Sequence, residues 1–407
     1  MPSVVRTFNG RCRLSFDIGV ELDTDLKLKL RSDGQVRVSA MLPFAEQAVK
    51  VMQANNGTKL VACSLRGHVS NPEGEIVIPK LLLNVQSVAG TPQRTLVTFE
   101  LISVSHAEIE YSKVAPNQTV EVHYGLTNFA FLGCEYSRTA SGAYLDKFSS
   151  VLGGIELTFK RSPDHEVTVK ALADSRDVAV TAELTTNVSS ASLGHIKELI
   201  DDATILLSYA TGTYISSIYQ DIYSNGQLLK SILYSAKTGP YTHREWVIDA
   251  NNLADCDLRI FLETCYPAFR TLKSDFGLNI VLEFLVISNQ GRYSEVRFLL
   301  DSLAAECLLS HLSSYFTKIG KTEDMSSFRS RMKELLNHFG VTHQDSELDF
   351  ILIRDKIVHT GRFPSEVNPS AETTKLRNLL DRTMLMILGY RGKFYLNCRN
   401  QYAREVL

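Results

Sequence analysis

An arginine and a histidine, Arg354 and His359, lie five positions apart in an apolar stretch, with Asp355 directly after the arginine. An arginine keeps its charge at physiological pH and can hold a phosphate through two parallel hydrogen bonds. A histidine gains and loses a proton near neutrality, so it can move protons at the same phosphorus atom. This pair of side chains could therefore cleave RNA. A structural explanation also exists, because Arg–Asp pairs are common on surfaces and histidines are favoured near helix C-termini.

The spacing sets a geometric condition on such a site. Five residues of an α-helix turn through about 500°, so Arg354 and His359 would lie roughly 140° apart around the axis. Two arrangements could bring them together. The helix could end or distort near Thr360-Gly361, or two copies of the chain could each supply part of one site on a two-fold axis.

Other catalytic patterns are missing or incomplete. The sequence has no GxGxxG after a strand, no GxSxG and no HExxH. A metal-dependent enzyme remains a further alternative, because His338, His343, Asp345 and Asp349 are close in sequence. Two histidines five positions apart do not share a helix face, however. We therefore predict a site without metal or cofactor.

Composition indicates an ordinary globular protein. The chain has 407 residues, of which 44% are hydrophobic and 22% charged, enough for two or three domains. No run reaches the roughly 18 apolar residues of a membrane span, and the first residues lack a secretory signal, so we expect a cytoplasmic protein. The seven cysteines are scattered without a close pair, which predicts small core residues. From Lys318 onward, 15 Lys and Arg outnumber 11 Asp and Glu, the right sign for a polyanionic partner.

The first 190 residues show the period-two alternation of strands. Residues 26–30 and 35–40 alternate around Asp33-Gly34, which predicts a hairpin with one buried face. Further strands are predicted at 59–65, 75–78, 95–104, 119–124, 155–160, 166–172 and 178–184, with a helix near 44–53. Many short strands with little helix between them are typical of an antiparallel sandwich or barrel.

The period changes near Ser192. Apolar residues then recur at spacings of three and four, which predicts an amphipathic helix with Ser192 as its N-cap. A second hairpin, 214–223 with 227–234, is predicted around Asn225-Gly226. Beyond Asp249, helices are predicted at roughly 250–271, 275–288, 292–317, 325–339, 345–360 and 371–390.

These patterns together predict an α+β protein. We expect an antiparallel β-rich sensor or interaction domain at 1–190, a connector of one helix and one β-hairpin at 191–245, and an all-α helical bundle at 246–407.

From about 292 to 390 the chain resembles the HEPN superfamily, whose ribonuclease members carry Arg, often a polar residue, and then His after four to six intervening residues. Arg354, Asp355 and His359 match that motif. The long predicted helix before it is similar to the first HEPN helix through Glu295, Arg297, Leu303 and Glu306. The strand-rich first half followed by this bundle, with Ile357-Val358-His359-Thr360-Gly361-Arg362-Phe363, is similar to ApeA-like bacterial phage-defence proteins.

The resemblance implies a metal-independent endoribonuclease, in which the ribose 2'-hydroxyl of RNA attacks the adjacent phosphorus. His359 would be the general base or acid, Arg354 would stabilise the transition state, and Asp355 would orient either partner. Lys356 and Arg362 would hold flanking phosphates, or serve only as solvated surface charges. The family also implies a homodimer through the bundle, a phage or cellular trigger at the N-terminal domain, and a role in abortive infection.

One alternative stays open within the same family. Some HEPN domains are inactive, and many active members have Asn where this chain has Asp355. The chain could then be a non-catalytic dimerisation and trigger-binding protein.

Overall fold

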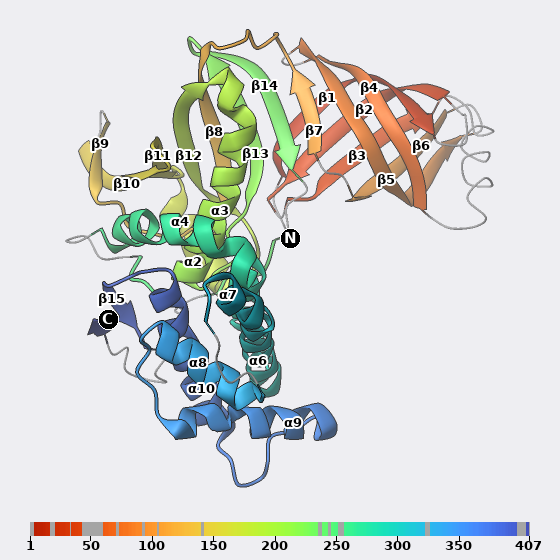
Figure 1. Cartoon of the computed structure of the whole chain (residues 1–407). Helices are drawn as coiled ribbons and strands as arrows, with labels where there is room; N and C mark the ends of the chain where they lie inside the picture. The colour runs from red at the N-terminus through yellow and green to blue at the C-terminus, as the bar shows by residue number, and fades with distance from the viewer. Residues whose placement is uncertain are drawn as a thin grey trace.

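The computed structural model describes residues 4–16, 21–32, 34–42, 60–70, 73–91, 94–103, 106–139, 142–234, 238–242, 246–250, 256–321, 326–396 and 404–406. The predicted α+β class is confirmed: antiparallel strands build the N-terminal part, and helices build most of the C-terminal part (Figure 1). None of the helices in these residues has the length and apolar character needed to cross a membrane.

Six strands form a sheet that closes on itself. They are β1 (Val4–Phe16), β2 (Glu21–Arg31), β3 (Val36–Leu42), β4 (Leu60–Ser70), β5 (Glu73–Thr91) and β6 (Arg94–Ser103). Their order is β4-β1-β2-β3-β6-β5, and β4 also pairs with β5, which completes the ring. The first predicted hairpin is confirmed as β2 and β3, with Leu28 opposite Val38. The predicted helix at 44–53 lies outside the described residues.

A short strand, β7 (His106–Glu110), joins this closed sheet to a second one, because it pairs with both β5 and β14. The order continues as β7-β14-β13-β8-β12-β11-β10-β9. The bounds are β8 (Thr119–Thr127), β9 (Glu135–Thr139), β10 (Gly142–Leu152), β11 (Ile155–Arg161), β12 (Val180–Ser189), β13 (Ser217–Ser224) and β14 (Gln227–Tyr234). The hairpin predicted at Asn225-Gly226 is confirmed, with φ values of 50° and 76° at its turn.

One predicted strand is wrong. Residues 166–172 fall in a helix, α2 (His165–Ser175). The prediction rested on alternating apolar residues, yet Val167 is exposed, while the two buried residues, His165 and Leu172, are seven positions apart, which is a helical spacing. Arg176 ends the helix in a left-handed conformation and donates its N–H to the Leu172 carbonyl.

The predicted helix after Ser192 is confirmed as α3 (Leu193–Thr211), which follows the short 3₁₀ turn η1 (Ser190–Ser192) and lies against the second sheet (Figure 1). The Ser192 side chain makes no capping hydrogen bond.

The bundle contains α4 (Asp257–Phe276), α5 (Leu278–Ser288), α6 (Ser294–Ser310), α7 (Leu312–Lys318), α8 (Phe328–His338), η2 (Asp345–Asp349), α9 (Phe350–Thr360) and α10 (Pro369–Ile387). The predicted helix 292–317 is two helices, α6 and α7, which meet at His311. Two short strands follow, β15 (Lys393–Tyr395) and β16 (Arg404–Val406).

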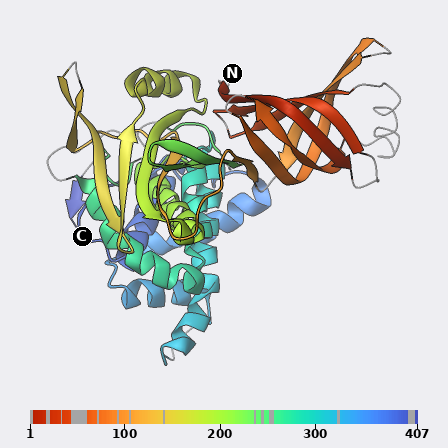
Figure 2. The same cartoon turned by 90° about the horizontal axis from the view of Figure 1, so that it is seen from above.

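The buried apolar residues form two clusters. One fills the closed sheet, which projects to one side of the molecule (Figure 2). The other runs without interruption from β8–β12 through α3 into the helical bundle. Helix α3 is therefore packed between the second sheet and the bundle. The domain limits at 190 and 245 remain predictions.

A disulfide joins Cys134, before β9, to Cys256, before α4, across 122 positions of sequence. No local pattern around either cysteine predicts this pairing. Cys12, Cys63 and Cys265 are buried, as expected for small core residues.

A buried ion pair fastens the closed sheet to the second sheet. Arg6 on β1 donates two hydrogen bonds to the Asp221 carboxylate on β13, at 2.7 and 2.5 Å. The Arg6 guanidinium also lies 3.8 Å from the centre of the Tyr219 ring, and Ser231 donates to Asp221 at 2.7 Å. Both charges are satisfied although the pair is largely out of water.

A second buried network centres on Arg377 of α10. Its Nε donates to both oxygens of Asp381, at 3.0 and 2.9 Å. Its Nη1 donates to the Leu285 carbonyl at 2.7 Å, and to Ser288 and Asn289 at 3.0 and 3.1 Å. Asp301 of α6 lies 3.7 Å from Nη1, so two carboxylates surround one cation.

We expect Asp221→Asn to lower the free energy of unfolding by about 3 kcal/mol, because it leaves the Arg6 guanidinium buried without a counter-charge. Urea titration measures this loss. The control is Asp23→Asn, which removes the partner of Arg13 from an exposed ion pair of 2.8 Å and should leave the midpoint unchanged. Equal midpoints for the two variants would contradict the role given to Asp221.

Burial raises the pKa of Asp301 to about 6, although nearby Arg377 opposes this shift. Between about pH 4 and pH 6 the Asp301 carboxyl therefore keeps its proton in the folded protein but loses it in the unfolded chain. The contribution of Asp301 to the free energy of unfolding falls as pH rises through that window. Relative to wild type, Asp301→Asn should gain about 1–3 kcal/mol between pH 4 and pH 7. Unfolding titrations at both pH values test this, with exposed Asp174→Asn as control; a pH-independent difference would refute it.

Candidate active site

Helix α9 carries the predicted catalytic residues at the end of the bundle away from the second sheet (Figure 1). It packs on α6, and its buried residues Phe350, Ile353 and Ile357 recur at spacings of three and four. Gly361 ends it with a φ of 72° and donates its N–H to the Ile357 carbonyl at 2.8 Å. The edge contact of Phe363 with Phe298, at 5.2 Å between ring centres, holds the following segment on α6.

Arg354 is held from two sides. Its side chain is 28% exposed and forms an ion pair with Glu306 of α6. Its Nη1 also donates to Asp355 at 3.0 Å. A guanidinium has five N–H donors, so these two partners leave further donors for another acceptor.

His359 lies in the last turn of α9 and is exposed. Within the described chain, its side chain makes no hydrogen bond or ion pair. Asp355 is four positions before it, so the carboxylate and the imidazole share one face of the helix. Lys356 and Arg362 are also exposed.

The structure brings Asp355 toward both partners but does not bring Arg354 and His359 together. Both residues lie inside α9, which continues to Thr360. The helix does end at Thr360-Gly361, as the first arrangement supposed, but this end lies after His359 and does not bring Arg354 and His359 together. In one chain the two side chains leave the helix roughly 140° apart.

Two exposed apolar residues accompany these side chains. Leu352 is 68% exposed and lies seven positions before His359, while Val358 is 60% exposed and lies four positions after Arg354. Leu303 of α6, three positions before Glu306, is exposed as well. These side chains would be covered if α9 contacted another molecule.

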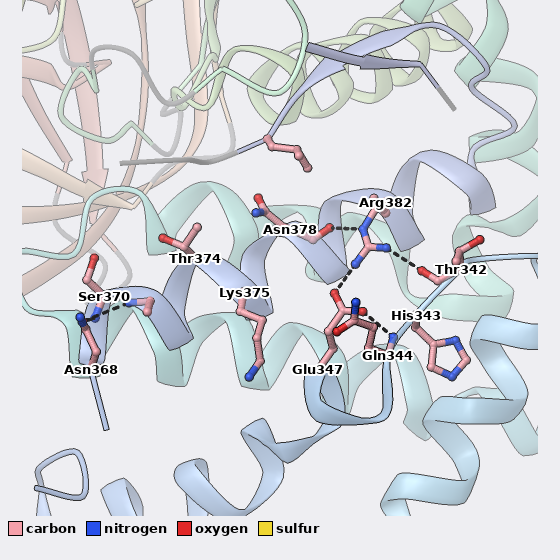
Figure 3. A pocket seen from close by; sticks show the side chains of 12 residues that line it. Thr342, His343, Gln344, Glu347, Asn368, Ser370, Thr374, Lys375, Asn378 and Arg382 are labelled. Carbon is pink, nitrogen blue, oxygen red and sulfur yellow. Dashed lines mark hydrogen bonds and ion pairs between the residues drawn. The ribbon is translucent and has the colours of Figure 1, made fainter. Parts of the chain in front are cut away.

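A cavity of about 730 Å³ lies nearby, between η2 and α10, but neither Arg354 nor His359 lines it. Arg382 crosses this cavity and donates to the carbonyls of Asn378 and Thr342, at 3.3 and 2.6 Å, and it pairs with Glu347 (Figure 3). Its charge is thus already compensated. The cavity is polar, and it is separate from the predicted catalytic motif.

The residues considered for a metal site, among them His343, Asp345 and Asp349, each contact a different partner. Asp345 pairs with Lys333 at 2.8 Å and Asp349 with Arg329 at 3.0 Å. His343 Nδ1 lies 3.1 Å from the Val341 carbonyl. Among the residues that the structure describes, no three His, Cys, Asp or Glu side chains converge in a way that could hold a metal ion.

The ion pair between Glu306 and Arg354 was not predicted from the sequence. Glu306 is far from Arg354 along the chain, and only the packing of α6 on α9 brings the two together. Its position on the predicted long helix was the only available signal.

Comparison of the chain with protein-family models, curated proteins and solved structures gave no match.

Proposed function

We propose that this protein is a metal-independent endoribonuclease whose active site forms between the α9 helices of two copies. The observation that carries the proposal is the composition of the sides of α9 that are not buried against α6: an exposed histidine, a partly exposed arginine positioned by carboxylates, and two exposed apolar side chains. The resemblance of Arg354, Asp355 and His359 to the HEPN motif supports the same conclusion.

The chemistry needs no added nucleophile, because RNA carries one. The 2'-hydroxyl attacks the adjacent phosphorus, the bond to the 5'-oxygen breaks, and a 2',3'-cyclic phosphate forms. His359 of one copy removes the 2'-hydroxyl proton, and a water molecule protonates the leaving 5'-oxygen. Arg354 donates to the non-bridging oxygens, where negative charge develops. Lys356 and Arg362 contact flanking phosphates.

Two chains are required by geometry. Arg354 and His359 diverge on one α9, so a single copy cannot aim both at one phosphate. A two-fold pairing of α9 helices would place Arg354 of one copy opposite His359 of the other. The same pairing would cover Leu352 and Val358, whose exposure in one chain it explains.

A ribonuclease acting on cellular RNA works in the cytoplasm and harms its own cell unless it is controlled. We therefore assign the closed sheet, which projects from the rest of the molecule (Figure 2), to binding of a phage or cellular trigger in abortive infection. Disulfides are rare in the cytosol, so the Cys134–Cys256 bond would form there only under oxidising conditions.

The second candidate is a non-catalytic dimerisation and trigger-binding protein. The two carboxylates around Arg354 favour it, because they are also what a structural arginine requires. The two candidates share the α9 interface and differ in RNA cleavage.

Wild-type protein incubated with total RNA in EDTA should produce fragments with 2',3'-cyclic phosphate ends. His359→Ala should reduce the rate by about 10² to 10⁴ because it removes the proton-transfer group. Arg354→Ala should abolish cleavage, and exposed His195→Ala on α3 should retain it. Mapping fragment ends gives the measurement, and circular dichroism checks folding. Intact RNA with the wild-type chain would select the non-catalytic candidate.

A mixture of the two inactive variants tests the shared site. In a mixed pair, Arg354 of the His359→Ala chain can face His359 of the Arg354→Ala chain, so one site is complete. Random pairing should restore about a quarter of wild-type activity.

Adding Leu352→Asp to both chains should prevent this restoration, whereas Val167→Asp on α2, equally exposed but distant in the fold, should not. No recovery in the simple mixture, with both variants folded and wild type active, would place the site within one chain.

A further inference from the structure

A cavity of about 310 Å³ lies where the bundle meets the second sheet. Its walls come from α3, α5, the segment between α3 and β13, and the end of β14. None of the residues that line it belongs to α9. A molecule bound here would contact the sheet and the bundle at once.

The walls are held in place by hydrogen bonds within the chain. Ser208 of α3 accepts from the Ile215 N–H at 2.9 Å and donates to the Thr204 carbonyl at 2.6 Å. Thr127 of β8 donates its N–H to the Ser216 carbonyl at 2.9 Å, and its hydroxyl accepts from the Ser216 N–H at 3.2 Å. The segment beside the cavity is thus fixed without any ligand, which limits the ordering that binding would require.

One polar group in the wall lacks a partner. Ser217 lines the cavity and is 7% exposed, yet its buried hydroxyl makes no hydrogen bond to any residue that the structure describes. Buried polar atoms are nearly always paired, so an orphan in a native protein calls for a specific explanation. Within the described residues no hydrogen bond holds this hydroxyl in its present rotamer, so a change of χ1 on ligand binding would break none. A ligand that supplies the missing partner provides that explanation.

The charges and rings around the cavity restrict the ligand. Lys197 is neutralised by Asp201 at 2.5 Å, and its ammonium lies 4.6 Å from the centre of the Tyr234 ring. The Tyr214 hydroxyl donates to Glu283, a second carboxylate in the lining, at 3.5 Å. Two carboxylates against one paired cation disfavour a phosphate group. Ile205, Leu282 and the two tyrosines supply apolar and aromatic surface.

We propose that this cavity binds an uncharged molecule of nucleoside size, with its planar ring against the apolar and tyrosine surface and a hydroxyl or amide hydrogen-bonded to Ser217. The volume is at the small end of the roughly 300–1,000 Å³ range of ligand pockets, which excludes a dinucleotide. The proposal is independent of ribonuclease activity.

The test uses the full chain with adenosine, guanosine, cytidine and uridine, and with their 5'-monophosphates, at concentrations up to millimolar. Calorimetry and thermal unfolding measure binding. At least one nucleoside should bind and raise Tm, and its monophosphate should bind at least about tenfold more weakly because of the carboxylates. Failure of all four nucleosides, or tighter binding of the monophosphate, would overturn the proposal.

Ser217→Ala separates a ligand contact from a structural role. It should weaken nucleoside binding by about tenfold while leaving the Tm of the free protein unchanged or higher, because no internal hydrogen bond is lost. Ser150→Ala on β10 is the matched control: its hydroxyl is also buried and unpartnered, but it does not line the cavity, so binding should not change. Wild-type affinity in Ser217→Ala, or a lower Tm of the free variant, would each count against the site.

Discussion

The buried guanidinium of Arg377 determines how the helices of the bundle meet. Because an arginine cannot release its charge, its burial is tolerated only where other groups satisfy it. Those groups belong to α10 itself, to the end of α5 and to α6. Asn289, one of them, also donates to the Gly212 carbonyl at 3.0 Å, directly after α3. A single cation thus links three bundle helices to the helix that covers the second sheet.

Both proposed sites depend on the helices that this network aligns. Glu306, which holds Arg354, is on α6 one turn beyond the network residue Asp301. Leu282 and Glu283 line the cavity of about 310 Å³ between the bundle and the second sheet. They are on α5, close to Leu285, whose carbonyl accepts from Arg377. A shift of α5 against α6 would therefore change the position of the cavity wall relative to the support of α9. Shared helices are a physical basis for coupling, although only a change in one site's affinity with the other occupied would measure it.

Local patterns were sufficient for much of the fold. The Asn225-Gly226 turn and the three-and-four spacing of α3 each depend on neighbouring residues, and both were predicted correctly. The strand predicted at 166–172 failed because its apolar residues fit either period, and burial decided for a helix. Contacts between distant segments were not predictable: the double pairing of β7 and the Arg6–Asp221 bond, across 215 positions, arise only from tertiary packing. For the same reason, the contact between Glu306 and Arg354 was not predicted.

The two carboxylates around Arg354 are not equivalent, and in the proposed ribonuclease this difference would let a paired arginine bind a phosphate. Glu306 is fixed on α6 with a side chain 30% exposed, whereas Asp355 is 57% exposed and can rotate into solvent. An arriving phosphate would displace the mobile carboxylate and keep the fixed one. Displaced Asp355 shares a face with His359, where it can stabilise the imidazolium formed on proton uptake. Asparagine at this position would release Arg354 more easily but could not neutralise that cation, so phosphate binding and proton transfer place opposite demands on residue 355.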